Sequence, residues 1–264
     1  MKYRMIALDI DGTLLTSARK LPKEHIDAMR AAVAAGVHVM IATGRPDRAA
    51  SWVLQTAGVE GLLLSVGGSL IHRFPSEELL VEFCLDSSFV RDFMDYCTQK
   101  GWFFHCIHGS EFNYTRVCEE SILTDHYFGY PGRVRTLEEM AGMTFHKGNV
   151  VAQGRTHEIA KILQERFDGR AVIQVADDVV IDVTPAGVDK GHSIALAAER
   201  LGVDISEVIA VGDADSDISM LRAAGLGVCM ANGTPNTLAA ADYIAPSNDE
   251  FGVREVIERF ILEK

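Results

Sequence analysis

The feature that constrains this chain most is the alternation of short apolar runs with helical patterns at its two ends. Near the N-terminus, apolar runs at 3–8, 37–42 and 62–65 are separated by a helical pattern at 22–35 and a second one after Pro46. The same alternation returns in the last third of the chain. Strands that alternate with helices predict a parallel sheet with right-handed crossover connections. We therefore expect an α/β fold built on a parallel sheet.

The middle of the chain has a different character. Residues 83–184 contain fourteen of the twenty aromatic residues and four of the five cysteines. We expect them to form an α+β domain inserted into a core made of residues 1–82 and 185–264. Within it the patterns predict helices at 90–100 and 156–167 and strands at 102–107, 112–115, 171–176 and 179–183.

Charge and cysteine content exclude several functions. With 25 basic and 37 acidic residues, the 264-residue chain has a net charge of −12, which repels nucleic-acid backbones. The most apolar stretch, 31–42, is shorter than the ~18 apolar residues that a membrane span needs. Five cysteines without a CxxC pair indicate reduced thiols. We expect a cytoplasmic protein that binds neither nucleic acid nor membranes, and the sequence indicates no obligatory protein partner.

Four polar stretches lie where core strands are expected to end. Ligands of open parallel sheets bind at this edge, so the fold would gather at least three carboxylates, one ammonium and one hydroxyl in one crevice. Neighbouring carboxylates repel each other at low dielectric, and a divalent cation would neutralise them. Oxygen ligands without an imidazole favour Mg²⁺ over zinc. The stretches are Asp9-Ile10-Asp11-Gly12-Thr13, Thr43-Gly44-Arg45, Asp189-Lys190-Gly191 and Gly212-Asp213-Ala214-Asp215-Ser216-Asp217.

This set of groups suits phosphoryl transfer. A free carboxylate beside a metal can attack phosphorus and form an aspartyl phosphate. The cation and the lysine would take up charge on the equatorial phosphate oxygens. Thr43 precedes Pro46, where a helix is expected to begin, so its hydroxyl and the following N–H groups would face a phosphate.

The motifs resemble those of the haloacid dehalogenase superfamily, and specifically its Cof-type hydrolases with a large inserted cap. The first family motif, DxDGTL, is present at 9–14, and the second, a threonine, stands at Thr43 within Ile-Ala-Thr-Gly-Arg-Pro. The lysine motif is Lys190, and the acidic motif is Gly212-Asp213 with Asp217. The resemblance covers the whole chain in order. It implies a Rossmann-like core with an inserted α+β cap of the C2 type.

The resemblance implies roles for four carboxylates. Asp9 would be the nucleophile and a metal ligand. Asp11 would give its backbone carbonyl to Mg²⁺, while its side chain would protonate the leaving group and then activate water. Asp213 would complete the protein ligands of the metal, and Asp217 would orient metal-bound water or only cap the next helix. An acid/base carboxylate two residues after the nucleophile favours hydrolysis of the intermediate.

A phosphate site is implied as well. Thr43 and Lys190 would hold the phosphate with help from the Gly44 N–H, although Thr43 could instead be only a helix N-cap. Ser216 stands where the family usually has asparagine, and it would donate one hydrogen bond with a shorter reach. Gly67 replaces another frequent asparagine, near the hinge of the cap. These departures bear on substrate preference and turnover more than on reaction type.

The sequence therefore predicts a Mg²⁺-dependent phosphatase for small phosphorylated metabolites. Sugar phosphates are expected first, and cofactor phosphates such as flavin mononucleotide or pyridoxal phosphate, or nucleotides, come next. A phosphomutase with the same nucleophile remains an alternative, as does a phosphoacceptor switch or binding protein without enzymatic activity. The sequence does not choose among the cap residues that would contact substrate, of which His105, His108, Arg133 and Arg135 are candidates.

Overall fold

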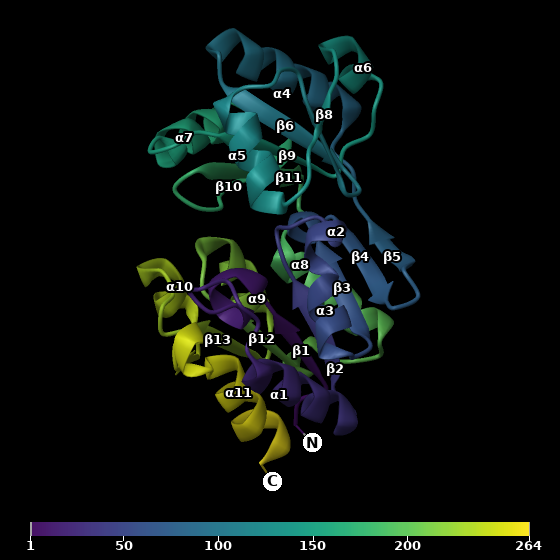
Figure 1. The fold of residues 1–264 in the computed structure, drawn as a ribbon, viewed down its shortest axis with the longest axis vertical. Helices are drawn as coiled ribbons and strands as arrows, with labels where there is room; N and C mark the ends of the chain where they lie inside the picture. Colours follow the sequence, from purple (N-terminus) through teal and green to yellow (C-terminus); the bar gives the residue numbers. More distant parts are fainter. Residues whose placement is uncertain (1, 264) are drawn as a thin grey trace.

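Two β-sheets organise the chain, which the computed structural model describes from residue 2 to residue 263. The core sheet has the order β14-β13-β12-β1-β2-β3-β4-β5, and the cap sheet has the order β10-β11-β9-β6-β7-β8 (Figure 1). The core strands are β1 (Met5–Leu8), β2 (His38–Ala42), β3 (Gly61–Ser65), β4 (Leu70–Phe74), β5 (Glu78–Glu82), β12 (Val208–Gly212), β13 (Leu226–Met230) and β14 (Tyr243–Ala245). The cap strands are β6 (Phe103–His108), β7 (Glu111–Tyr114), β8 (Arg133–Val134), β9 (Lys147–Val151), β10 (Ala171–Val175) and β11 (Val180–Pro185).

The core sheet is parallel from β14 to β3, as the alternation of strands and helices predicts. Its central strand β1 is buried at all four residues, and Met5 lies opposite both Val208 of β12 and His38 of β2. Strands β4 and β5 extend the sheet in the antiparallel sense. The predicted α/β class and parallel core are confirmed, with an antiparallel edge added to them.

Helices cover both faces of the core sheet. On one face, apolar side chains of α1, α3 and α11 pack on the strands, and on the other face α8, α9 and α10 do so. The expected helix after Pro46 is broken into two short helices, α2 and α3. The core helices are α1 (Lys23–Ala34), α2 (Asp47–Ala50), α3 (Trp52–Ala57), α8 (Lys190–Arg200), α9 (Ile218–Ala223), α10 (Pro235–Ala240) and α11 (Gly252–Ile257).

The cap sheet carries its own apolar core on the face that points away from the core sheet. There α4 and α7 pack on the strands around the aromatic cluster of Phe89, Phe93, Phe104 and Phe167. Helix α5 lies on the opposite face of the cap sheet, on the side toward the core (Figure 1). The cap helices are α4 (Ser87–Lys100), α5 (Glu119–Phe128), α6 (Leu137–Ala141) and α7 (Thr156–Arg166).

The chain passes between the two sheets twice, from β5 to α4 and from β11 to α8. The boundary expected after residue 82 lies at the end of β5, and the one expected after residue 184 lies one residue before the end of β11. We use "cap" for residues 83–184 and "core" for the rest, as a proposed division. Among residues 2–263, no helix combines the length and the apolar character that a membrane span requires.

Candidate active site

Three of the predicted residues come together because parallel neighbouring strands end at one edge. Asp9 follows β1, Thr43 follows β2 and Asp213 follows β12, and these strands are adjacent in the sheet. Lys190 differs from the expectation that its stretch follows a core strand. It follows the cap strand β11 and begins α8, which brings it to the same edge from the cap side.

Lys190 holds two of the carboxylates. Its Nζ donates to Asp9 Oδ1 at 2.7 Å and to Asp217 Oδ1 at 2.5 Å. All three side chains are buried, with at most 8 % of any one exposed. Burial makes an unpaired charge costly, so this arrangement is stable only while the ammonium and the carboxylates stay together.

Asp217 organises the loop after β12. Its second oxygen, Oδ2, accepts hydrogen bonds from the backbone N–H groups of Asp213 and Ala214, each at 3.0 Å. Its side chain makes no hydrogen bond that caps α9, but the bond from the Ala214 N–H caps the short turn Asp215–Asp217 that leads into α9. Asp213 in turn accepts a hydrogen bond from Thr13 Oγ1 at 2.7 Å. The neighbouring Asp215 accepts hydrogen bonds from the side chains of Thr234, Asn236 and Thr237.

Negative charge exceeds positive charge in this group. Burial, together with repulsion by Asp217 and Asp213, raises the pKa of Asp9 well above its usual value, although Lys190 opposes the shift. Burial and repulsion by Asp217 also raise the pKa of Asp213 to about 7. Burial would lower the pKa of Lys190, but attraction by Asp217 and Asp9 outweighs it and raises that pKa. The Lys190 ammonium therefore stays charged, but its single positive charge does not balance the negative charges of the three carboxylates.

A divalent cation fits this group. Oxygen atoms of Asp9, Asp213 and Asp217 lie within 4.8 Å of one another. Three ionised carboxylates and one ammonium leave a net charge of −2, which Mg²⁺ would balance. Asp217 has both oxygens engaged, whereas no hydrogen bond to Asp9 Oδ2 or Asp213 Oδ2 is found within residues 2–263. These two free oxygens suit a hard cation.

Asp11 points toward a pair of arginines rather than toward this group. Arg45 donates to both of its carboxylate oxygens, at 2.7 and 2.5 Å, and Arg19 lies 3.7 Å away. The ring of Tyr127, from the cap helix α5, covers the guanidinium groups of Arg19 and Arg45 at 4.9 and 5.6 Å. Burial raises the pKa of Tyr127 to about 12. No pattern in the sequence assigns a role to Arg45, although it lies within the threonine motif, and none points to Tyr127.

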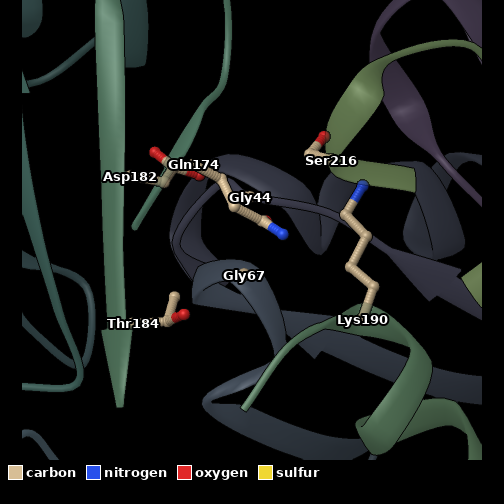
Figure 2. Close-up of a pocket in the computed structure, with 7 residues that line it drawn as sticks. All are labelled: Gly44, Gly67, Gln174, Asp182, Thr184, Lys190 and Ser216. Carbon is tan, nitrogen blue, oxygen red and sulfur yellow. The ribbon is translucent and has the colours of Figure 1, made fainter. Parts of the chain in front are cut away.

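Three of the four predicted phosphate-binding residues, Gly44, Lys190 and Ser216, line a small cavity between core and cap (Figure 2). The fourth, Thr43, is not among the lining residues. Thr43 is buried and accepts a hydrogen bond from the Arg45 N–H at 3.2 Å. It is not a helix N-cap, because Pro46 occupies that position of α2. The cavity is lined by Gly44, Gly67, Lys190 and Ser216 of the core and by Gln174, Asp182 and Thr184 at the cap side.

None of the four cap residues suggested by the sequence lines this cavity. His105 is buried in the cap, and the His108 ring contacts the carbonyl of Thr144. Arg133 and Arg135 both pair with Glu111. Gln174, Asp182 and Thr184 take their place, and only the antiparallel pairing of β10 with β11 brings these three together.

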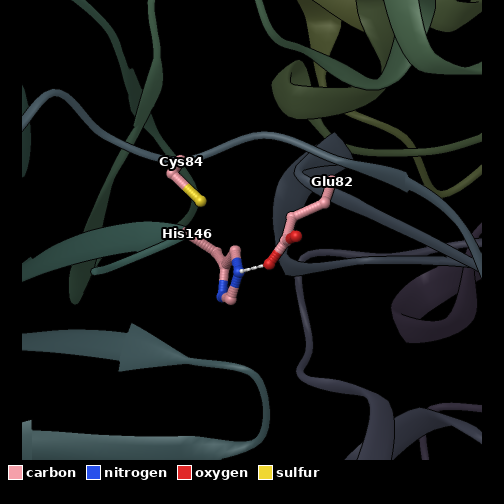
Figure 3. A group of neighbouring side chains, drawn as sticks. All are labelled: Glu82, Cys84 and His146. Atoms are coloured by element: carbon pink, nitrogen blue, oxygen red, sulfur yellow. Dashed lines mark hydrogen bonds and ion pairs between the residues drawn. The ribbon is translucent and has the colours of Figure 1, made fainter. Parts of the chain in front are cut away.

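A second group of metal-ligand type, Glu82, Cys84 and His146, lies where the chain enters the cap (Figure 3). His146 Nδ1 accepts a hydrogen bond from the Gly109 N–H at 2.9 Å, so the ring proton lies on Nε2 and points to Glu82 Oε1, also at 2.9 Å. A cation at Nε2 would need the lone pair that this proton occupies. The group therefore fits a hydrogen-bonded hinge contact and not a cation.

The comparisons with known proteins agree with this geometry. The model of the haloacid dehalogenase-like hydrolase family matches residues 6–257. The chain belongs to this family. Membership confirms the resemblance that the motifs indicate and the expected enzyme class, a phosphoric monoester hydrolase.

Curated relatives and solved structures match along nearly the whole chain. The 5-amino-6-(5-phospho-D-ribitylamino)uracil phosphatase YcsE of Bacillus subtilis is 28% identical over 98% of this chain and 96% of its own length. The phosphoglycolate phosphatase of Methanothermobacter thermautotrophicus is 27% identical over 98% of this chain and 99% of its own. A solved sugar phosphatase of subclass IIB is 25% identical, with a TM-score of 0.88 over 97% of this chain and 98% of its own.

Proposed function

We propose that the chain is a Mg²⁺-dependent phosphatase that hydrolyses small phosphomonoesters through an aspartyl phosphate on Asp9. The observation that carries this proposal is the buried Asp9 carboxylate, held by Lys190 through one oxygen while the other oxygen is free. A carboxylate oriented in this way at a strand end is placed to act as a nucleophile. The phosphatases among the relatives support the same reaction class.

The proposed reaction consists of two successive displacements at phosphorus. In the first, Asp9 attacks phosphorus, the bond to the leaving-group oxygen breaks, and Asp11 protonates that oxygen. In the second, Asp11 takes a proton from water, the water oxygen attacks phosphorus, and the bond to Asp9 breaks. Asp11 is thus the proton donor of the first step and the proton acceptor of the second, and Arg45 orients its carboxylate by donating to both oxygens.

The phosphate would be held by Thr43, the Gly44 N–H, Lys190 and Ser216, which lie around the cavity and the end of β2. Mg²⁺ would be bound by Asp9, Asp213 and the Asp11 carbonyl, with Asp217 supporting the loop, and it would withdraw charge from the phosphate oxygens. Lys190 supplies a fixed positive charge at the same place. Its charge does not vary in the neutral range, because its pKa is raised.

The cavity lining favours a hydroxylated leaving group. Its cap side chains are an amide, a carboxylate and a hydroxyl, and no aromatic residue is among the lining residues. Flat rings of nucleotides and of flavin or pyridoxal cofactors gain most from stacking on aromatic side chains. Sugar phosphates are therefore proposed first as substrates. A cytoplasmic location, with five unpaired thiols, completes the proposal.

The test is phosphate release from p-nitrophenyl phosphate, with Mg²⁺ and with the metal chelated, for the wild type and for Asp9→Asn. We expect release only with Mg²⁺ and a loss of at least about a thousandfold in Asp9→Asn. Asp95→Asn, the same substitution at an exposed site on α4, is the matched control and should keep full activity. Activity that survives in Asp9→Asn would remove Asp9 as nucleophile. A phosphorylated protein without phosphate release would favour a mutase or a phosphoacceptor.

A further inference from the structure

The cap places a buried ion pair beside the phosphate site. Lys147 of β9 and Asp182 of β11 lie on the face of the cap sheet that meets the core, with Nζ 2.7 Å from Oδ2. Only 4 % of the Lys147 side chain and 13 % of the Asp182 side chain are exposed. Asn149 donates to the other Asp182 oxygen at 2.6 Å. Both oxygens of Asp182 are therefore held, and the pair has a defined orientation.

Lys147 also connects the cap to the core. Its Nζ donates to the carbonyl oxygen of Gly44 at 3.1 Å, one residue after Thr43. An ammonium group has three protons, so this contact and the one to Asp182 leave a third for another acceptor. The contact joins residues 103 positions apart in sequence and ties the closed cap to the phosphate-binding loop.

The closed cap leaves no room for a leaving group. The cavity that Asp182 shares with Lys190 and Ser216 has a volume of about 20 Å³, enough for about one water molecule (Figure 2). An ester can enter only if the cap lifts and the contact between Lys147 and Gly44 breaks. When the cap closes again, Asp182, which lines the cavity, and Lys147, which contacts Gly44, would lie next to the substrate.

One glycine of the core, Gly67, eases this approach, and a second, Gly44, lies directly beneath the ion pair. A Cβ at Gly44 would be in ordinary van der Waals contact with it, 3.4 Å from Lys147 Nζ and 3.6 Å from Asp182 Oδ2. At Gly67, which has a φ of +72°, a Cβ would come within 3.0 Å of Thr184 Cγ2. Gly67, one of the departures noted in the sequence, thus gives the cap strand β11 room to descend. Because Gly44 and Gly67 have no side chains, the side chains that border the proposed phosphate site at these two points come from the cap.

We propose that Lys147 and Asp182 determine specificity by charge, favouring a neutral hydroxylated leaving group over one that carries a carboxylate. A hydroxyl can donate to Asp182 and accept from Lys147 at once, which keeps both buried charges hydrogen-bonded. A carboxylate can accept from Lys147 but meets a like charge on Asp182. This inference rests on the proposed function and adds to it the residues that select the substrate.

The test compares two substrates that differ at one carbon, glycerol 3-phosphate with a terminal hydroxymethyl group and 3-phosphoglycerate with a carboxylate there. The measured quantity is the ratio of kcat/KM for the first to kcat/KM for the second. We expect a ratio above about 10 for the wild type. Asp182→Asn should lower it about tenfold, because the repulsion is gone, and Lys147→Gln should raise it about tenfold, because the attraction is gone. The ratio cancels any general loss of active protein.

Opposite shifts of the kcat/KM ratio in Asp182→Asn and Lys147→Gln distinguish selection by charge from a structural effect. A structural effect would change the ratio in the same direction in both variants, or would leave it unchanged in both. Asp95→Asn and Lys161→Gln, the same substitutions at exposed cap sites, are matched controls and should keep the wild-type ratio. If one single variant does not fold, the uncharged double variant Lys147→Gln/Asp182→Asn should bring the ratio toward 1. Ratios that are unchanged, or shifted in the same direction, overturn the proposal. Failure of the wild type on both substrates and on acetyl phosphate would instead overturn the phosphatase itself.

Discussion

Gly12 lies close to Asp213, and this closeness makes it a sensitive residue of the site. Its φ is +77°, and a Cβ there would overlap the Asp213 carboxylate. We predict that Gly12→Ala displaces Asp213, so that activity falls at least about tenfold and more Mg²⁺ is needed for half-maximal rate. Gly36→Ala is the matched control, because Gly36 has a similar φ of +84° but nothing within 4 Å of a Cβ. Both variants should lose about 1 kcal/mol of unfolding free energy, measured with denaturant. Equal activities would show that the approach to Asp213 is unimportant.

Single residues of the site were predictable where the chemistry lies next to a strand end. Asp9, Thr43 and Asp213 each follow a buried parallel strand, and apolar runs of this kind are visible in the sequence. Arg45 could not be assigned a role in the same way. Its contact with Asp11 depends on the direction in which the long Arg45 side chain points after β2, and the spacing of apolar residues in the sequence does not indicate that direction.

At the scale of elements, the N-terminus of α8 positions Lys190. Asp189 caps this helix, accepting a hydrogen bond from the His192 N–H at 2.8 Å. We predict that Asp189→Ala costs about 1 kcal/mol of unfolding free energy and loosens the first turn, so that kcat/KM falls about tenfold. Thr136→Ala removes a comparable cap from α6, where Thr136 accepts a hydrogen bond from the Glu139 N–H. It should cost a similar free energy while kcat/KM stays as in the wild type, and an equal loss of kcat/KM in both would contradict this account.

Several elements were not predicted from the sequence, and for two of them, α5 and β9, the physical reason is plain. In α5, Ser121 and Thr124 are buried while Ile122 and Leu123 are exposed, which inverts the pattern of an amphipathic helix. Strand β9 contains Lys147 and Asn149, which are buried because both pair with Asp182 of β11. Buried polar residues of this kind interrupt the apolar pattern by which a strand is recognised in a sequence. Lys147, which we propose takes part in substrate selection, lies on this strand.

At the scale of the whole molecule, buried histidines tie stability to pH. Burial, assisted by repulsion from Lys147, lowers the pKa of His105 to about 3, and neither ring nitrogen has a hydrogen bond within the described residues. Below pH 6.5 the unfolded chain binds a proton at this site that the folded protein does not bind until about pH 3. Stability must therefore decrease as pH falls through this window, by up to ~1.4 kcal/mol per pH unit for one such group.

We predict that His105→Phe removes this contribution, so that unfolding free energy measured from pH 7 to pH 4.5 falls less steeply than in the wild type. His157→Phe, at an exposed position of α7, is the control and should keep the wild-type slope. Identical slopes for the wild type and His105→Phe would mean that His105 is protonated in the folded protein. Other histidines with lowered pKa values, including His25 and His146, add to the common slope but cancel in the comparison.

The sequence indicates that the cap is inserted into the core, but it does not indicate which residues of the two make contact. The contacts that join them include Lys147 with Gly44, Ser69 with the His146 carbonyl, and His146 with Glu82. Each of them joins positions more than 60 residues apart, so their pairing appears only in the folded structure. The proposed catalytic residues could be found in the sequence because they lie in the core motifs, whereas the proposed substrate selection depends on this contact surface.

The central claim is that phosphate is transferred to Asp9 before it reaches water. The most direct test mixes the wild type with ³²P-labelled glycerol 3-phosphate and Mg²⁺, quenches in acid within milliseconds, and counts protein-bound label. We predict a burst of bound label that hydroxylamine releases, that maps to the peptide containing Asp9, and that is absent in Asp9→Asn. A control with a known acyl phosphate shows that the quench and the count can detect such a species. If the wild type then turns over substrate without protein-bound label at any time, the account is contradicted.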